Sequence, residues 1–113
     1  MGVRLTLALI ALAGTAQAEE LSLACAGDGW SLSISGLQAR LNFPSPTDMN
    51  IPSVVVAEGA EWPRAMTLIG ARDTAIVVLH DRLCTGGTHE VQVLTQRGQT
   101  PILLNGCCTE TGK

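Results

Sequence analysis

The sequence predicts an all-β protein, a small antiparallel β-barrel or sandwich of six to eight strands that is stapled by disulfide bonds. The first observation behind this prediction is that apolar and polar residues alternate with period two in several short segments. The second is that turn dipeptides separate these segments at regular spacing, with no helical period after residue 18. The third is an even number of cysteines, four, in a chain that starts with an export signal.

The first 18 residues are organised like a secretory signal peptide. Arg4 supplies a positive charge, an apolar run covers residues 5–13, and Ala-Gln-Ala at 16–18 matches the pattern before a signal-peptidase site. The run is shorter than the roughly 20 apolar residues of a transmembrane helix. We therefore expect cleavage after Ala18, which leaves residues 19–113 as a single periplasmic or secreted domain that is not transmembrane. The alternative is a lipoprotein anchored through Cys25, which follows an alanine in LSLAC.

The first strands of the domain are expected between residues 30 and 43. WSLSIS at 30–35 alternates large apolar with small polar residues, and Ser35-Gly36 is a turn dipeptide. LQARLNF at 37–43 alternates again, with its apolar residues on one face. PSPTDMNIP at 44–52 carries three prolines, so we expect the longest loop there and neither a central strand nor a helix.

The remaining strands are apolar or alternating segments joined by short turns. They are SVVVAEG at 53–59, AMTLIGA at 65–71, TAIVVLH at 74–80, HEVQVLTQ at 89–96 and TPILLNGCC at 100–108. Arg72-Asp73 predicts a hairpin between the second and third of these, and Arg97-Gly98 turns the fourth into the fifth. Trp62 precedes Pro63 and is therefore restricted to an extended conformation, so we expect it to begin a strand.

Charge and aromatic content argue against nucleic-acid binding. Without Arg4, six Lys and Arg face ten Asp and Glu, a net charge of −4. The basic residues are spread along the chain, and with no tyrosine, one phenylalanine and two tryptophans there is no stacking platform for bases. We expect no nucleic-acid partner.

The cysteines of the domain are Cys25, Cys84, Cys107 and Cys108. A bond between the adjacent Cys107 and Cys108 is the poorest pairing, because neighbouring side chains of a strand point to opposite faces. Cys84 is then joined to one member of the pair and Cys25 to the other. We favour Cys84–Cys107 and Cys25–Cys108, an arrangement that pins the last strand once on each face.

The segment LHDRLCTGGTHE at 79–90 suggests two kinds of chemistry. His80, Cys84 and His89, beside Asp81, resemble a metal-ligand set that cysteines of NGCC would complete. Their spacing is not a recognised zinc pattern and a disulfide would consume the thiolate, so we expect no metal and keep this set as the alternative. A cysteine or serine nucleophile with a histidine base would need a motif, yet the chain has neither G-x-S-x-G nor C-x-x-C. We expect no catalytic role and no cofactor.

The candidate binding residues fall into two groups. Thr85, Gly86, Gly87, Thr88 and His89 follow a cysteine, and paired glycines mark a tight loop where the backbone approaches another group closely. A turn beside a disulfide explains the same pattern. Trp30 and Trp62 form the second group, since an exposed tryptophan indicates a partner surface while a buried one indicates core.

Three segments of the chain resemble a family of uncharacterised bacterial envelope proteins. The segments are CAGDGWSLSISG, LCTGGTHEVQV and the terminal GCC, and they match in order and approximate spacing from Cys25 to Cys108. That family carries C-x-G-x-E-P-F-W-x-L, a later C-x-D-G-M-S loop and a closing G-C or G-C-C. Here Asp28-Gly29 replaces Glu-Pro-Phe, and residues 85–88 replace Asp-Gly-Met-Ser. The resemblance implies a small periplasmic barrel without an established activity.

The domain is also similar in kind to small periplasmic inhibitors of c-type lysozyme, which are exported, disulfide-linked, eight-stranded barrels. Their serine- and glycine-rich recognition loop has a nearby tyrosine and lysine, whereas this chain has no tyrosine and only Lys113. The expected function is thus non-catalytic binding of an unidentified envelope ligand or protein, in envelope maintenance or stress. The alternative is an inhibitor of a cell-wall hydrolase such as lysozyme, which inserts loop 84–89 or 44–52 into a cleft.

Overall fold

The computed structural model describes residues 22–111. The predicted signal peptide at 1–18 and the terminal Lys113 lie outside the described residues. Within the described range the chain forms strands and turns, with no helix, and therefore with no helix long and apolar enough to cross a membrane.

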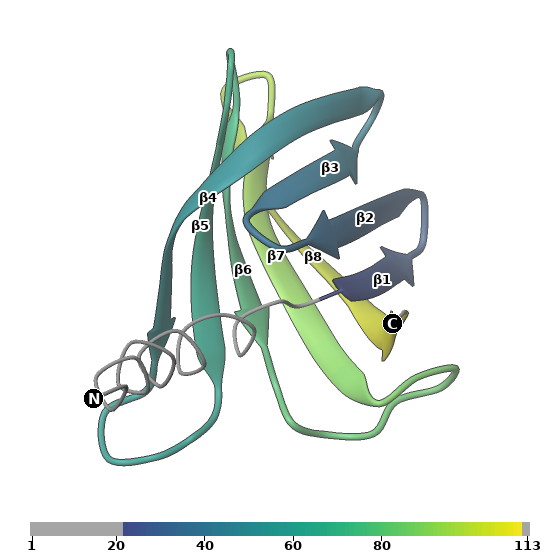
Figure 1. The fold of residues 1–113 in the computed structure, drawn as a ribbon. Coiled ribbons are helices and arrows are strands. Elements are labelled where there is room, and N and C mark those ends of the chain that lie inside the picture. The colour runs from purple at the N-terminus through teal and green to yellow at the C-terminus, as the bar shows by residue number, and fades with distance from the viewer. Residues whose placement is uncertain (1–21, 112–113) are drawn as a thin grey trace, which may run out of the picture.

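Eight antiparallel strands form one closed barrel (Figure 1). They are β1 (Ser22–Gly27), β2 (Trp30–Ser35), β3 (Gln38–Asn42), β4 (Pro46–Val56), β5 (Arg64–Gly70), β6 (Thr74–Leu79), β7 (His89–Arg97) and β8 (Thr100–Glu110). Each strand pairs with the next one along the chain, and β8 pairs with β1 to close the sheet. The predicted all-β, disulfide-stapled barrel is confirmed.

The alternation in the sequence decides which side chains enter the barrel. In β2, Trp30, Leu32 and Ile34 are buried while the serines between them face outward, because successive side chains of a strand point to opposite faces. All eight strands contribute buried apolar side chains to a single cluster. The interior of the barrel is therefore packed with protein rather than shaped for a ligand.

The prediction of a long loop at 44–52 is wrong, because residues 46–56 form the eleven-residue strand β4. Its prolines lie where a strand tolerates them. Pro46 is the first residue of the strand, and Pro52 lies in the register shift between Asn50 and Ser53, where the ladder to β5 is interrupted. The buried side chains of Met49 and Ile51 hold this half of the strand in the barrel wall.

Three other boundaries differ from the prediction. Strand β5 begins at Arg64, so Trp62 lies in the loop before it and does not begin a strand. Leu37 precedes β3 and is 64% exposed, so it does not share the buried face of Ala39 and Leu41. Residues 53–59 do not form a separate strand, because 53–56 complete β4 and the chain then turns.

The strands differ in length, and this staggers the barrel. β1, β2 and β3 have five or six residues, whereas β4 and β8 have eleven each. Among the described residues, β1 pairs with β8 between Cys107 and Glu110, so the first half of β8 extends beyond the closed part of the wall. In Figure 1 the β7–β8 hairpin correspondingly lies well above β1.

Candidate functional site

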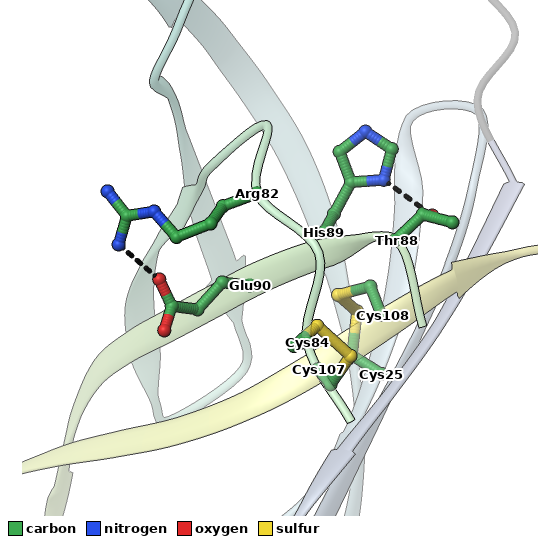
Figure 2. Close-up of a disulfide and its surroundings, with 8 residues drawn as sticks. All are labelled: Cys25, Arg82, Cys84, Thr88, His89, Glu90, Cys107 and Cys108. Carbon is green, nitrogen blue, oxygen red and sulfur yellow. Dashed lines mark hydrogen bonds and ion pairs between the residues drawn. A yellow bond between two sulfur atoms is a disulfide. The ribbon is translucent and has the colours of Figure 1, made fainter. Parts of the chain in front are cut away.

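The two disulfides start from the adjacent residues Cys107 and Cys108 of β8 (Figure 2). They lie on opposite faces of the strand, because successive side chains of a strand alternate and Cys108 is buried while Cys107 is partly exposed. Cys108 and Cys25 are direct partners across the β1–β8 ladder, with a Cα–Cα distance of 3.9 Å, and both are buried. Cys107 faces outward and bonds to Cys84 in the β6–β7 loop, at a Cα–Cα distance of 5.9 Å. The favoured pairing and the pinning of β8 on each face are confirmed.

The disulfides indicate an oxidising compartment outside the cytoplasm. They also contradict the lipoprotein alternative, because the sulfur of Cys25 is bonded to Cys108 and cannot carry a lipid. A chain beginning at Cys25 would in addition lose Leu23, which is 2% exposed inside the barrel.

The turn after Cys84 is held tightly against β8. Cys84 and Gly87 exchange backbone hydrogen bonds of 3.2 and 3.1 Å, and the Thr88 N–H donates to the Cys108 carbonyl at 3.0 Å. A Cβ at position 87 would lie 2.4 Å from that same carbonyl oxygen, so only glycine fits here. The paired-glycine segment is thus a rigid turn beside a disulfide, with Thr85 and Gly86 exposed at its tip.

Beside this turn lies a surface hollow of about 640 Å³. Its floor is the outer face of β1 and β2, where Ala24 pairs with Ser33 and Ala26 pairs with Ser31. The wall on one side is the turn at 85–86. Arg40, Asn42 and Pro46, from β3 and the start of β4, also line the hollow. Short side chains in the floor let a ligand approach the sheet closely.

A second group of polar and aromatic residues surrounds His89 at the start of β7. The rings of Trp62 and His89 lie 5.2 Å apart, and the Arg64 guanidinium lies 4.3 Å from the Trp62 ring centre. His89 Nδ1 is 3.0 Å from the Thr88 hydroxyl, and Asp81 Oδ1 is 3.9 Å from His89 Nε2. The structure therefore brings together three of the predicted binding residues, Trp62, Thr88 and His89.

This group places a hydroxyl, an imidazole and a carboxylate in sequence, which is the order of groups in nucleophilic hydrolases. Such chemistry also needs free N–H donors beside the nucleophile to stabilise an oxyanion. The N–H groups of Gly87 and Thr88 are already bonded to the carbonyls of Cys84 and Cys108. These two donors are therefore not free to stabilise an oxyanion, and a non-catalytic role is still our prediction.

Trp30 lies apart from the other candidates and is 6% exposed. Its indole covers Gly27 and Gly106, where an added Cβ would come within 2.2 and 2.6 Å of ring atoms. The indole N–H donates to the Asn105 carbonyl at 3.1 Å. In the structure Trp30 closes the barrel wall at the point where the pairing of β1 with β8 ends.

The alternative metal set does not come together as three ligands. Cys84 is consumed by its disulfide with Cys107, and His80 Nε2 lies 3.4 Å from the Gln92 side-chain oxygen. Among residues 22–111, no cluster of three or more His, Cys, Asp or Glu side chains is arranged to hold a metal ion.

Sequence reasoning missed the floor of the hollow. Its signal was present, because the outward residues Ser31 and Ser33 of WSLSIS are all small. Their neighbours Ala24 and Ala26 belong to β1, which the prediction did not recognise as a strand.

Comparisons of the chain with protein-family models, curated proteins and solved structures gave no match. The resemblance to bacterial envelope proteins therefore rests on the quoted segments alone.

Proposed function

We propose that this protein is a non-catalytic binding protein of the bacterial envelope, exported to the periplasm or secreted. Its ligand is expected in the hollow between the 84–87 turn and β1–β3, and the work of the protein is envelope maintenance or the response to stress. The observation that carries this proposal is the covalent attachment of an exposed turn beside a hollow with a floor of small side chains.

The apolar side chains that fill the barrel interior support a ligand site on the outer surface of the barrel. Barrels that carry small molecules hold them within the sheet, but here apolar side chains occupy that space. The hollow, in contrast, is open to solvent and is rigidly bounded on the side of the turn. Rigid walls reduce the ordering cost that a ligand must offset when it binds.

Binding to the hollow is tested by titrating the oxidised protein with soluble peptidoglycan fragments and following backbone amide signals by NMR. We expect shifts at Ala26, Ser33 and Gly86, the floor and wall of the hollow. The Ser33→Trp variant fills the hollow and should abolish these shifts. Ser53→Trp, at an exposed position on β4, is the matched control and should preserve them. Shifts that persist in Ser33→Trp, or that lie elsewhere, would contradict the proposed site.

A second candidate function, inhibition of a cell-wall hydrolase such as lysozyme, is favoured by Leu83. This side chain is 78% exposed in the β6–β7 loop, and the loop is fixed by the Cys84–Cys107 bond and the Arg82–Glu90 ion pair. A preorganised loop with an apolar tip is suited to enter a cleft. The other predicted insertion segment, 44–52, is largely taken up by β4.

The inhibitor candidate is tested with lysozyme and a suspension of bacterial cell walls. We expect inhibition by the unmodified protein and its loss in Leu83→Ser. Leu37→Ser is the control, because Leu37 is similarly exposed but lies away from this loop. Full lysozyme activity in the presence of micromolar unmodified protein would exclude this candidate.

A further inference from the structure

The two disulfides differ in how well a molecule from solution can reach their sulfur atoms. Cys25 and Cys108 are 3% and 0% exposed inside the barrel, whereas Cys84 and Cys107 are partly exposed on its outer surface. Exchange between a thiol and a disulfide begins when a thiolate attacks one of the two sulfurs, so it requires access to that sulfur. In the folded protein, exchange is therefore expected at the outer bond and not at the inner one.

Of the two sulfurs in the outer bond, that of Cys107 is next to the surface hollow described above. Cys107 lines this hollow together with Ala26, Thr85 and Gly86, whereas Cys84 does not line it. The side chain of Cys107 faces outward, and its direct partner across the β1–β8 ladder is Ala26. Because a methyl group is all that Ala26 places on that face, the sulfur of Cys107 is left open on the β1 side.

The other sides of Cys107 are covered by protein. A Cβ added to Gly87 would lie 2.7 Å from the Cys107 Sγ, so the backbone of the turn lies directly against this sulfur. On the β7 side, the direct partner of Cys107 is Glu90, which is held in an ion pair with Arg82 (Figure 2). The hollow is therefore the open approach to the Cys107 sulfur.

We propose that Cys107 is a modification site for small thiols, which enter the hollow and form a mixed disulfide with its sulfur. The thiolate of the small molecule bonds to the Cys107 Sγ, and the bond between the sulfurs of Cys107 and Cys84 breaks. Cys84 leaves as a thiolate and takes up a proton from water. One disulfide replaces another, so no further oxidant or reductant is needed. The proposal does not depend on the ligand-binding function.

The size and the lining of the hollow fit a thiol of a few hundred daltons. Its volume of about 640 Å³ falls within the roughly 300–1,000 Å³ of small-molecule sites. Ser31, Asn42 and Thr85 line it with hydroxyl and amide groups that can bond to the polar arms of such a molecule. Glutathione, a tripeptide thiol, is therefore a suitable probe.

The modification is expected to be local and reversible. After the outer bond breaks, Cys84 and Gly87 keep their two backbone hydrogen bonds, and the Thr88 N–H keeps its bond to the Cys108 carbonyl. These bonds hold the Cys84 thiol close to Cys107. It can then attack the mixed disulfide, restore the original bond and release the small thiol.

Mass spectrometry after treatment of the oxidised, folded protein with glutathione tests the site. Free thiols are trapped with iodoacetamide, and tandem spectra of the peptides locate each group. We expect glutathione on Cys107, alkylation of Cys84 and an intact Cys25–Cys108 bond. Protein unfolded in urea is the positive control, in which both disulfides should react. Glutathione on Cys84, earlier reaction of the inner bond, or no adduct in the folded protein would overturn the proposal.

A pair of variants tests whether the thiol arrives through the hollow. Ala26→Leu places a larger side chain beside Cys107 and should slow the exchange. Ala71→Leu makes the same change at an exposed position away from the hollow and should leave the rate unchanged. If Ala26→Leu does not fold, Ser31→Leu narrows the hollow from β2 and carries the same expectation. A narrowed hollow that leaves the rate in the folded protein unchanged would contradict the proposed route.

Discussion

The two disulfides leave neighbouring residues of β8 yet hold different parts of the molecule. Cys25–Cys108 lies inside the barrel and joins the first strand to the last, across 83 residues of sequence. Cys84–Cys107 lies outside and joins a loop to the wall, across 23 residues. The first therefore secures the closure of the fold, and the second secures the surface that we propose as functional.

The two regions also differ in the contacts that would still hold them together if their disulfide were removed. Within residues 22–111, four paired positions, 107–110 of β8, and the hydrogen bond from the Thr111 N–H to the Ser22 carbonyl join β1 to β8 at the seam of the barrel. The loop, in contrast, keeps the Cys84–Gly87 backbone bonds, the Thr88–Cys108 bond and the Arg82–Glu90 ion pair. We infer that the inner bond mainly determines stability and that the outer bond mainly determines local rigidity.

The largest effect is expected from removing the inner bond with Cys25→Ala and Cys108→Ala together. In the chain-entropy model a loop of this length contributes about 4.5 kcal/mol. That is a large part of the roughly 5–15 kcal/mol by which a domain is stable. Urea unfolding should show a much lower midpoint for the variant than for the unmodified protein. A midpoint within error of the unmodified protein would mean that the seam is held by other contacts.

A smaller loss is expected from removing the outer bond with Cys84→Ala and Cys107→Ala. Its shorter loop contributes about 3.4 kcal/mol in the same model. We expect the far-ultraviolet circular dichroism of the sheet to be retained, while amides at 84–88 exchange faster. If this variant were destabilised as much as the Cys25→Ala and Cys108→Ala variant, or more, the inference that the inner bond mainly determines stability would be contradicted.

The features that could be predicted from the sequence are those that depend on residues close together in the chain. The alternation of WSLSIS predicted β2 at its observed bounds, because burial of every second residue is a property of the segment itself. Cys107 and Cys108 could be assigned to opposite faces for the same reason. β1 was missed although Leu23 and Cys25 alternate inward, since this segment closely follows the predicted signal peptide and has few large residues.

The strand at the prolines and the hollow could not be predicted from the sequence, because both depend on tertiary structure. Whether Pro46 and Pro52 interrupt a strand depends on which neighbour needs their N–H, and this is decided by the register with β3 and β5. The hollow combines the turn at 85–86 with β1, β2 and β3, which lie far away in the sequence. Composition could identify the turn, but not which strands the closed barrel places beside it.

The Trp30→Phe substitution tests how much Trp30 contributes to stability at the point where the β1–β8 pairing ends. The substitution keeps an aromatic ring over Gly27 and Gly106 but removes the hydrogen bond to Asn105, worth about 1 kcal/mol. Trp62→Phe is the matched control, since the Trp62 indole donates no hydrogen bond within residues 22–111. Urea unfolding should show the greater loss for Trp30→Phe. The opposite order would indicate that the loop before β5 contributes more to stability than the seam.

The smallest effect concerns Arg40 and Asp48, direct partners on β3 and β4, a pair of strands that no disulfide joins. The hydrogen bond from Arg40, and secondarily its charge, lower the pKa of Asp48 below its usual value. Because the folded-state pKa is the lower one, any stabilisation is present above the unfolded-state pKa and is lost as pH falls through the folded-state pKa. Both side chains are mostly exposed, so solvent and salt weaken the interaction.

Carboxyl titration by NMR measures this pair directly. In Arg40→Gln the midpoint of Asp48 should move up toward about 3.9, the value of an unperturbed aspartate. High salt should move the midpoint of the unmodified protein in the same direction. A midpoint that is insensitive to both changes would mean that the ion pair is not populated in solution. In that case the β3–β4 hairpin depends on its ladder and on the buried Ala39, Leu41 and Met49 alone.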